Sequence, residues 1–240
     1  MVRGTRHLLG AEADRFRWVT DTILKSLKEY WGFQEFVPSL LAPRELFAEQ
    51  VGEQVKGQMY EFQDRGNPPR DLCLIPEVTA IIRDLYKREW SKSMSKPVKV
   101  CYLSRCYRYE RPQRGRYREF WQLGVEFLGD DYLISSAYPM DVMLEHCLVR
   151  AGLGRGCFRT CFSVKRGLGY YVEDGFEVEC NRLGAQKQIA GGGRYDCGIG
   201  WAIGVDRLLL ALEKPGEQES LEGEGMDSDA CLDDVRQSHV

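Results

Sequence analysis

Two long segments of alternating apolar and polar residues stand on either side of a short, arginine-rich connection. The first reads VKVCYLSRCYRYE from Val98, the second reads REFWQLGVEFLG from Arg118, and RPQRGRY lies between them. Alternation with a period of two predicts β-strands, and so short a connection predicts that the strands pair in antiparallel fashion. This feature limits the fold most, because it requires a sheet built around an antiparallel ribbon.

The other segments predict helices and further strands around that ribbon. Apolar residues at intervals of three and four predict an amphipathic helix over residues 12–30 and a short helix over 44–52. Residues 59–76 predict a hairpin turning at Gly-Asn-Pro-Pro, followed by a helix from about Val78. Residues 163–214 predict two or three strands and a last helix. We therefore predict an α/β fold of the α+β kind, a mainly antiparallel sheet flanked by helices.

Charge divides the chain into two parts. The formal charge of the 240 residues is −3, but residues 214–240 contain eight acidic and two basic residues, so residues 1–213 carry +3. A mildly basic body of this length, with 43% apolar residues, predicts one domain with a sizeable core and is compatible with a polyphosphate or nucleic-acid partner. The tail is rich in Gly, Glu, Asp and Ser and buries too little apolar surface to fold, so we expect it to be disordered.

Cysteine and histidine usage argues against a metal centre. The nine cysteines include no CxxC pair, and His7, His146 and His239 are far apart. No zinc-ligand spacing occurs, and the thiols should be reduced. No apolar run reaches the length of a signal peptide or a membrane span. We therefore expect a soluble cytoplasmic protein without membrane contact.

The arginine-rich connection is the first candidate site. Side chains two apart on a strand lie on one face, so Arg108 can share a cleft with Gln122 and Glu126 on the returning strand. Arginines on the loop can each bind phosphate oxygens through two hydrogen bonds. The alternative is a solvated hairpin whose arginines pair with Glu110 and Glu119 at little energetic benefit.

Several segments, in the same order, resemble the histidyl-tRNA synthetase family of class II aminoacyl-tRNA synthetases. Residues 105–129 are similar to motif 2 of that family, and AIGVDRLLLALE at 202–213 is similar to motif 3. The others are RGTRHLL near the start, GFQEFVPSLL with ELF as motif 1, MYEFQDR, PEVTA, RGLGYY at 166–171 and GGGRYD at 191–196. The resemblance implies the class II catalytic fold over residues 1–213, followed by the acidic tail at 214–240.

The resemblance also implies an ATP-dependent ligase that joins histidine to tRNA in two steps. The histidine carboxylate attacks the α-phosphorus of ATP, magnesium-bound pyrophosphate leaves, and the histidyl group then passes to tRNA(His). ATP is the implied cofactor, Mg²⁺ enters with it, and no metal ligand is expected on the protein. Carried over by motif, the catalytic residues are Arg108 at the α-phosphate, Arg207 at the γ-phosphate and Arg166 as an additional cation beside the α-phosphate.

Further matched positions divide between the nucleotide and the amino acid. ATP would be bound by Arg108, Arg116, Arg118, Phe120 and Arg207, with the phenyl ring on adenine. Histidine would be bound by Glu77, Thr79, Gln122, Glu126, Tyr170 and Tyr171. The first three would hold the α-ammonium group, and Glu126 and Tyr171 would bind the imidazole nitrogens. Without the resemblance, Glu126 could equally be an outward-facing charge, and the two tyrosines could be core aromatics.

Other features differ from the family. An inserted helical domain and a C-terminal anticodon-recognition domain have no counterpart here, so tRNA(His) is a candidate partner whose usual binding parts are missing. Ile75, Val78 and Gly169 replace an arginine, a glycine and an aspartate of the family motifs. Dimerisation through motif 1 is still expected, which makes the protein a homodimer.

Two alternatives stay open from the sequence. A histidine-sensing module would resemble the regulatory subunit of ATP phosphoribosyltransferase, which shares the core without the anticodon domain. The retained arginines, above all Arg166 and Arg207, argue against that alternative. A non-catalytic, truncated synthetase paralogue that only folds and dimerises is favoured by Val78, Gly169 and two connections that are shorter than in the family, at residues 130–165 and between GGGRYD and GWAIG.

Overall fold

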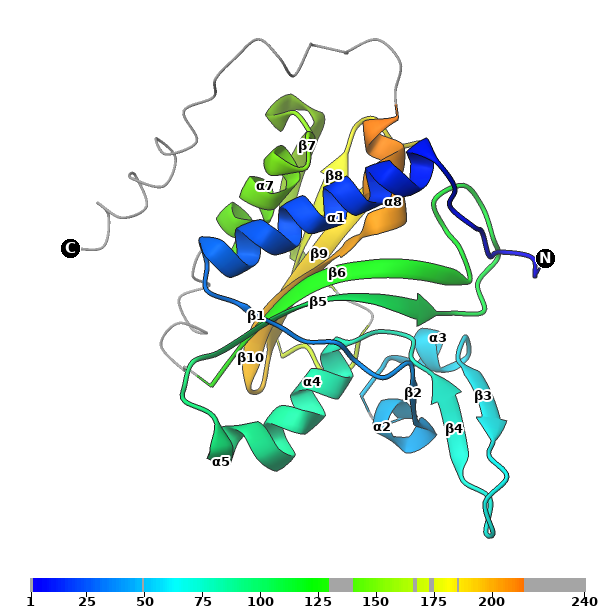
Figure 1. The fold of residues 1–240 in the computed structure, drawn as a ribbon. Helices are drawn as coiled ribbons and strands as arrows, with labels where there is room; N and C mark the ends of the chain where they lie inside the picture. Colours follow the sequence, from blue (N-terminus) through cyan, green and yellow to red (C-terminus); the bar gives the residue numbers. More distant parts are fainter. Residues whose placement is uncertain are drawn as a thin grey trace.

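Two sheets carry the fold of the computed structural model, which describes residues 2–48, 50–129, 140–165, 168–172, 175–184 and 186–213. The large sheet has the strand order β1-β5-β6-β10-β9-β8-β7, and its neighbouring strands are antiparallel except for β1 with β5 (Figure 1). Its strands are β1 (Gln34–Glu35), β5 (Val98–Tyr107), β6 (Glu119–Leu128), β7 (Phe158–Val164), β8 (Gly175–Cys180), β9 (Gln188–Tyr195) and β10 (Gly198–Gly204). The small antiparallel sheet has the order β2-β4-β3, with β2 (Leu41–Pro43), β3 (Tyr60–Gln63) and β4 (Asp71–Leu74). The predicted fold class is confirmed.

Helices lie on both sides of the large sheet. Helices α1, α7 and α8 cover one face, and α4 lies on the other side with the small sheet (Figure 1). The helices are α1 (Ala11–Glu29), α2 (Arg44–Ala48), α3 (Glu53–Lys56), α4 (Thr79–Leu85), α5 (Ser91–Ser93), α7 (Met140–Arg150) and α8 (Val205–Leu212). A π-helical turn, η1 (Tyr86–Trp90), joins α4 to α5, and a short 3₁₀ turn, η2 (Arg155–Cys157), precedes β7.

The large sheet separates two hydrophobic layers because its strands alternate. Leu123 and Val125 of β6 and Trp201 of β10 are buried against the layer that contains α1 and α7. On the opposite face, Tyr102 of β5 and Tyr195 of β9 are buried against the layer that contains α4. Successive residues on the strands therefore point alternately to the two faces of the sheet. One face is covered by a closed core, and the other can contribute to a site.

On this second face of the large sheet, glycines lie where β6, β9 and β10 meet. Gly200 pairs with Glu126 on one side and with Gly193 on the other, and Gly204 pairs with Gln122. A Cβ atom on Gly124 would lie 2.5 Å from the Tyr102 ring. The missing side chain at Gly124 therefore lets the Tyr102 ring lie close to the sheet.

Most predicted elements occur where the patterns place them. The helix predicted over 12–30, the hairpin at 59–76, the helix after Val78 and the paired strands on either side of the arginine-rich connection are confirmed. The strands and the last helix predicted over residues 163–214 are confirmed as β8, β9, β10 and α8, whereas β7, which begins at Phe158 and pairs with β8, was not predicted. Helix α7 was not predicted. The proposed disordered tail, 214–240, lies outside the described residues.

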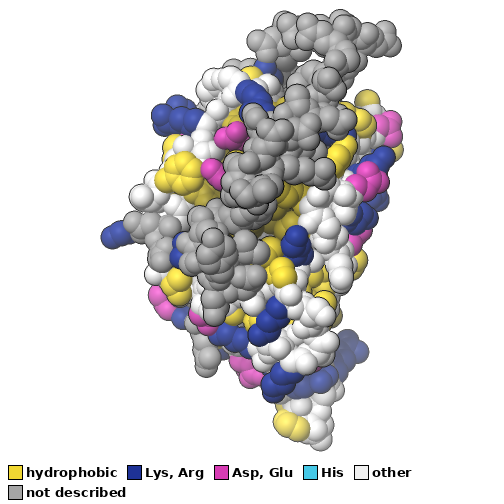
Figure 2. All heavy atoms as spheres, turned by 90° about the vertical axis from the view of Figure 1, so that its left-hand side faces the viewer, with side chains coloured by type: hydrophobic (Ala, Val, Ile, Leu, Met, Phe, Trp, Pro, Cys, Tyr) yellow, Lys and Arg dark blue, Asp and Glu magenta, His cyan; other side chains and the backbone are white. Residues whose placement is uncertain are grey.

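The surface is mixed in charge. Figure 2 shows Lys and Arg side chains concentrated in the lower half of one face, on the side where Figure 1 has α4 and α5. The segment from α4 through η1 to α5 has four basic and two acidic residues. Over the part of the chain that the structure describes, no helix combines the length and hydropathy needed to cross a membrane.

Candidate active site

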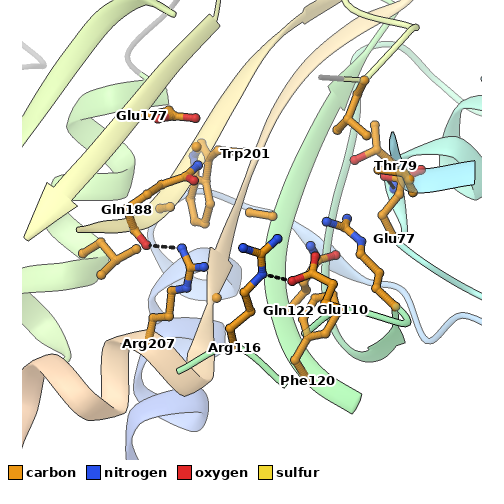
Figure 3. Close-up of a pocket in the computed structure, with 18 of the residues that line it drawn as sticks. Glu77, Thr79, Glu110, Arg116, Phe120, Gln122, Glu177, Gln188, Trp201 and Arg207 are labelled. Carbon is orange, nitrogen blue, oxygen red and sulfur yellow. Dashed lines mark hydrogen bonds and ion pairs between the residues drawn. The ribbon is translucent and has the colours of Figure 1, made fainter. Parts of the chain in front are cut away.

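A cavity of about 350 Å³ opens on the glycine-lined face of the large sheet (Figure 3). Of the residues predicted from sequence, the cavity is lined by Glu77, Thr79, Arg108, Arg116, Phe120, Gln122, Tyr170, Tyr171 and Arg207. Two predicted residues, Arg118 and Glu126, are not part of the lining. Arg166 lies outside the described residues, so its predicted position stays a prediction. The sequence motifs thus converge on one cavity although they are far apart along the chain.

One end of the cavity is cationic. Arg207, in the first turn of α8, donates from Nε to the carbonyl oxygen of Gly115 at 3.2 Å and from Nη1 to that of Gln188 at 2.7 Å. Its Nη2 donates to the side-chain oxygen of Gln186 at 2.7 Å. All three acceptors are neutral. Burial lowers the pKa of Arg207, and the positive charges of Arg116 and Arg108 lower it further. An anion bound here would relieve this repulsion.

Arg108 and Arg116 complete the cationic end from the β5–β6 connection. The Nε of Arg108 donates to the carbonyl oxygen of Pro76 at 2.9 Å, and its guanidinium lies 5.4 Å from the centre of the Phe120 ring. Arg116 forms an ion pair with Glu110 at the rim, visible in Figure 3. The predicted pairing of a loop arginine with Glu110 therefore occurs, but inside the cavity wall rather than on a solvated hairpin.

Arg118 points away from the cavity. Its Nε donates to the carbonyl oxygen of Glu110 at 3.0 Å, and its guanidinium lies 3.9 Å from the centre of the exposed Tyr109 ring. The predicted contact of Arg118 with phosphate would require this side chain to move. It stays a prediction.

The other end of the cavity is acidic. Glu77 is 3% exposed and caps the start of α4: its carboxylate oxygens accept from the backbone N–H groups of Thr79 at 2.9 Å and Ala80 at 2.8 Å. The hydroxyl of Tyr170 donates to the same carboxylate at 3.1 Å. Burial raises the pKa of Glu77, although these hydrogen bonds and the charge of Arg108 act in the opposite direction. A substrate cation would favour the ionised form.

Glu126 lies behind this group and is only 1% exposed. One oxygen accepts from the hydroxyl of Thr79 at 2.6 Å and the other from the hydroxyl of Tyr195 at 2.7 Å. Burial raises the pKa of Glu126 to about 8 against the effect of these two hydrogen bonds, and the charge of Glu77 adds to the rise. Burial therefore favours the protonated form of the Glu126 carboxyl group, and hydrogen bonds to Thr79 and Tyr195 occupy both of its oxygens.

Gln122 and Tyr171 lie between the two ends. The thiol of Cys106 donates to the side-chain oxygen of Gln122 at 3.2 Å, which orients the amide over the sheet. The Tyr171 ring packs on Tyr170 at 4.8 Å between centroids. A Cβ on Gly193 would lie 2.9 Å from the Tyr171 ring, so the absence of that side chain lets the tyrosine approach the sheet.

Sequence reasoning missed several residues in and behind the cavity. Tyr195 does not line the cavity but donates to Glu126 behind it, and its register two residues from Gly193 could have placed it on the same face. Tyr102, Lys165 and Glu177 line the cavity. Tyr102 could have been found from the alternation along β5, whereas no local pattern distinguishes Lys165 or Glu177.

The three positions that differ from the family motifs do not block the cavity. Ile75 and Val78 have no exposed surface and pack in the hydrophobic layer beside α4. A Cβ on Gly169 would lie 3.3 Å from the carbonyl oxygen of Gln50. None of the three lines the cavity. Within the described ranges there is no group of three or more His, Cys, Asp or Glu residues placed to hold a metal ion.

Comparison with known proteins gives a consistent result. Residues 4–157 match the family model described as histidyl-tRNA synthetase. A histidine–tRNA ligase from Archaeoglobus fulgidus is 40% identical over 320 positions, which cover 91% of this chain and 77% of that protein. Because 320 positions exceed the 240 residues of the chain, at least 80 positions of the relative have no counterpart here.

Solved structures share the fold. The apo histidyl-tRNA synthetase of S. aureus superimposes with a TM-score of 0.72 at 23% identity, covering 100% of this chain and 81% of that one. A protein from Bacillus halodurans, described as an ATP phosphoribosyltransferase regulatory subunit/histidyl-tRNA synthetase, gives a TM-score of 0.73 at 17% identity and covers 91% and 84%. These similarities establish the fold of the cavity's scaffold.

Proposed function

The chain belongs to the histidyl-tRNA synthetase family, and from this premise we propose that it activates histidine with ATP to form histidyl-adenylate. The observation that carries the proposal is the polarity of one cavity, with Arg108, Arg116 and Arg207 at one end and the buried carboxyl group of Glu77 at the other. ATP and histidine have matching charges: a polyphosphate at one end and an α-ammonium group at the other.

At the cationic end, the arginines would bind the phosphates of ATP. The histidine carboxylate oxygen attacks the α-phosphorus, the bond from that phosphorus to the bridging oxygen breaks, and pyrophosphate leaves with the electron pair. Negative charge then grows on phosphate oxygens, where guanidinium groups that are already held in place stabilise it at small reorganisation cost. Mg²⁺ would enter as part of the nucleotide substrate. Phe120 offers an aromatic face for adenine beside Arg108.

At the acidic end, Glu77 would bind the α-ammonium group of histidine. The ammonium would supply the positive charge that favours the ionised form of this buried carboxyl group. Imidazole recognition by Glu126 requires an exchange of partners, because Thr79 and Tyr195 already donate to both of its oxygens. We propose that an imidazole nitrogen replaces the Thr79 hydroxyl on Glu126, which leaves Thr79 free to turn toward the substrate's ammonium end.

Histidine-dependent exchange of labelled pyrophosphate into ATP tests the proposal. Arg108→Gln should lower the exchange rate by about 100-fold or more, since it removes a charge that acts on the developing phosphate anion. Arg88→Gln is the matched control, because Arg88 forms an exposed ion pair with Asp84 on the helix outside the cavity. The proposal would be refuted if the unaltered chain exchanged pyrophosphate no faster than Arg108→Gln.

A histidine-sensing module is the second candidate. It is favoured by the hydrogen bonds at the acidic end, which involve no arginine of the cationic end. These bonds join Glu77, Thr79, Glu126 and Tyr195. Calorimetric titration with histidine, in the absence and presence of ATP, distinguishes the candidates. A sensor binds histidine and yields no adenylate, whereas a chain that binds neither ligand while folded would be a non-catalytic paralogue.

Transfer of the histidyl group to tRNA(His) and assembly into a homodimer are further parts of the proposal. The relative from A. fulgidus contains residues without counterpart in this chain, so we expect adenylate formation to be retained better than tRNA charging. Comparing pyrophosphate exchange with charging of tRNA(His) on one preparation measures the difference.

A further inference from the structure

The N-terminal residues 3–6 pack against the arginine-rich β5–β6 connection, as the chain's first segment in Figure 1 shows. The carbonyl oxygen of Gly4 accepts from the backbone N–H of Arg118 at 2.7 Å, and the side chain of Arg118 donates to the carbonyl oxygen of Arg3 at 3.4 Å. Gly4 has φ of +88°, and a Cβ there would lie 2.9 Å from the side chains of Arg118 and Pro112. The contact is therefore close and needs glycine.

Arg6 extends this contact to the start of α8. Asp206 is 4% exposed, and its Oδ1 accepts from Arg6 Nη2 at 2.6 Å and from Arg6 Nε at 3.1 Å. The other oxygen, Oδ2, accepts from the backbone N–H of Trp121 at 2.8 Å. The Arg6 guanidinium also lies 4.9 Å from the centre of the Tyr117 ring. One buried carboxylate thus joins the N-terminal segment, strand β6 and helix α8.

Asp206 itself lines the cavity, and the backbone on either side of its contacts leads directly to residues of the candidate ATP site. Arg207 follows Asp206 in the chain, and Trp121 lies between Phe120 and Gln122. Phe120, Gln122 and Arg207 all line the cavity. Removing Arg6 would leave a buried carboxylate without its cation, so Asp206 would turn toward water and release the Trp121 N–H.

We propose that Arg6 is a positioning residue for ATP, acting through Asp206 on Arg207 and Phe120. This inference rests on the proposed function. It assigns a role to the RGTR segment, whose own residues do not line the cavity, and predicts that the segment controls affinity for the nucleotide but not for histidine.

The test combines calorimetry and hydrogen exchange. Arg6→Ala should weaken ATP binding by about tenfold, because a small displacement of Arg207 and Phe120 is costly, while the Kd for histidine stays unchanged. Amide exchange at Arg118 and Trp121 should accelerate. Arg6→Lys should recover part of the ATP affinity, since it keeps the charge but lacks the two-nitrogen contact with Asp206. Arg88→Ala serves as the control arginine and should leave both affinities unchanged.

The possible outcomes separate this inference from the proposed function. Absence of ATP binding by the unaltered chain contradicts the nucleotide part of the proposed function and this inference with it. If the unaltered chain and folded Arg6→Ala bind ATP equally strongly, the inference alone is overturned. It is also overturned if Arg6→Ala loses affinity for ATP and for histidine to the same extent. If Arg6→Ala does not fold, Arg6→Lys takes its place, and a smaller loss that is still selective for ATP is expected, because the ammonium group keeps only part of the contact with Asp206.

Discussion

Glu77 and Glu126 are two buried carboxyl groups that share one hydrogen-bonding residue, Thr79. The backbone N–H of Thr79 serves Glu77, and its hydroxyl serves Glu126. Burial raises the pKa of both acids, to about 8 for Glu126. An acid with a raised pKa in the folded chain keeps a proton that the unfolded chain has released. Its contribution to stability is complete below pH 4.5 and declines as the pH rises through about 8.

The first prediction concerns this pH dependence. Glu126→Gln removes the titrating group, so the fall in Tm of the ligand-free chain between pH 5 and pH 8 should be smaller than in the unaltered chain. Between pH 5 and pH 8, the loss of unfolding free energy should be smaller in Glu126→Gln by at least ~1 kcal/mol, which corresponds to about 2–4 °C in Tm for a chain of this size. Scanning calorimetry at a series of pH values measures it.

Glu119→Gln is a suitable control for the Glu126 experiment. Glu119 is on the same strand, but its side chain is 25% exposed and faces Arg105. The control should keep the full pH dependence. If Glu126→Gln showed the same slope of Tm against pH as the unaltered chain, the protonated state assigned to Glu126 would be wrong.

The second prediction concerns the shape of the Arg207 side chain. Its guanidinium reaches three separate oxygens, on Gly115, Gln188 and Gln186, and an ammonium group cannot span them. Arg207→Lys should therefore raise the KM for ATP by about 10- to 100-fold although it keeps the charge. Kinetics of pyrophosphate exchange with varied ATP provide the measurement, and full activity of Arg207→Lys would show that charge alone suffices.

At the scale of elements, two glycines on β10 differ in how closely their surroundings pack against them. A Cβ on Gly200 would lie 1.9 Å from a carboxylate oxygen of Glu126 and 2.5 Å from the carbonyl oxygen of Val125. A Cβ on Gly204, on the same strand and face, would have its nearest atom at 3.7 Å. One strand therefore offers a crowded glycine and an open one that can be compared directly.

The third prediction follows from that contrast. Gly200→Ala should destabilise the fold by about 1–3 kcal/mol, since the backbone of β6 and the Glu126 side chain must both shift. It should also weaken histidine binding, because Glu126 loses its position. Gly204→Ala is the matched control for stability, which it should keep. Chemical denaturation compares the stability of the two variants and calorimetry measures histidine binding by Gly200→Ala; equal stability of the two variants would contradict the crowding assigned to Gly200.

Elements with a regular period could be predicted from the sequence, and irregular ones could not. The spacing of Phe16, Val19 and Ile23 predicted α1, because one apolar stripe must be buried. Strands β5 and β6 followed from alternation. The buried residues of helix α7, which are Met140, Met143, Leu144, Cys147 and Leu148, recur at intervals of three and four, so the same rule could have predicted this helix. It was missed because Val142 and Val149 reduce the contrast between its two faces. Strand β7 was missed because most of its residues are exposed or half-buried, which leaves no clear alternation.

The candidate site shows the same division. Motif spacing and alternation placed Arg108 and Gln122 on one face, and the register of β5 with β6 agrees. The partners of Glu126 could not be predicted, since they depend on how α4 and β9, far apart in the sequence, meet at that carboxyl group. Arg118 illustrates a second limit. Its side-chain direction depends on contact with the N-terminal segment, which no local pattern reports.

At the scale of the whole molecule, the small sheet presents an apolar face that the described chain leaves partly exposed. The register of β2, β4 and β3 puts six apolar residues on this face: Leu41, Pro43, Tyr60, Phe62, Leu72 and Leu74. Leu41 is 51% exposed and Phe62 is 43% exposed, whereas Ala42 and Cys73 on the other face are buried. An exposed apolar face of this kind favours association with a second copy of the chain.

The last prediction is that this face mediates dimerisation. One chain has a mass of 27.6 kDa, and sedimentation equilibrium of the unaltered chain should give twice this mass. Leu41→Asp and Phe62→Asp should each shift the equilibrium toward monomer, because a carboxylate placed in the centre of an apolar interface loses its hydration without gaining a partner. Association through a two-fold axis would bring each substituted residue into the interface twice, which enlarges the effect.

Phe162→Asp tests whether the chain associates through a specific interface or through any exposed apolar residue. Phe162 is 62% exposed but belongs to β7, at the edge of the large sheet and outside the small one. If dimerisation depends on the small sheet, Phe162→Asp leaves the dimer intact while the two small-sheet variants dissociate it. A monomer in the unaltered chain at concentrations of tens of micromolar, or equal dissociation by all three variants, would show that motif 1 does not supply the interface.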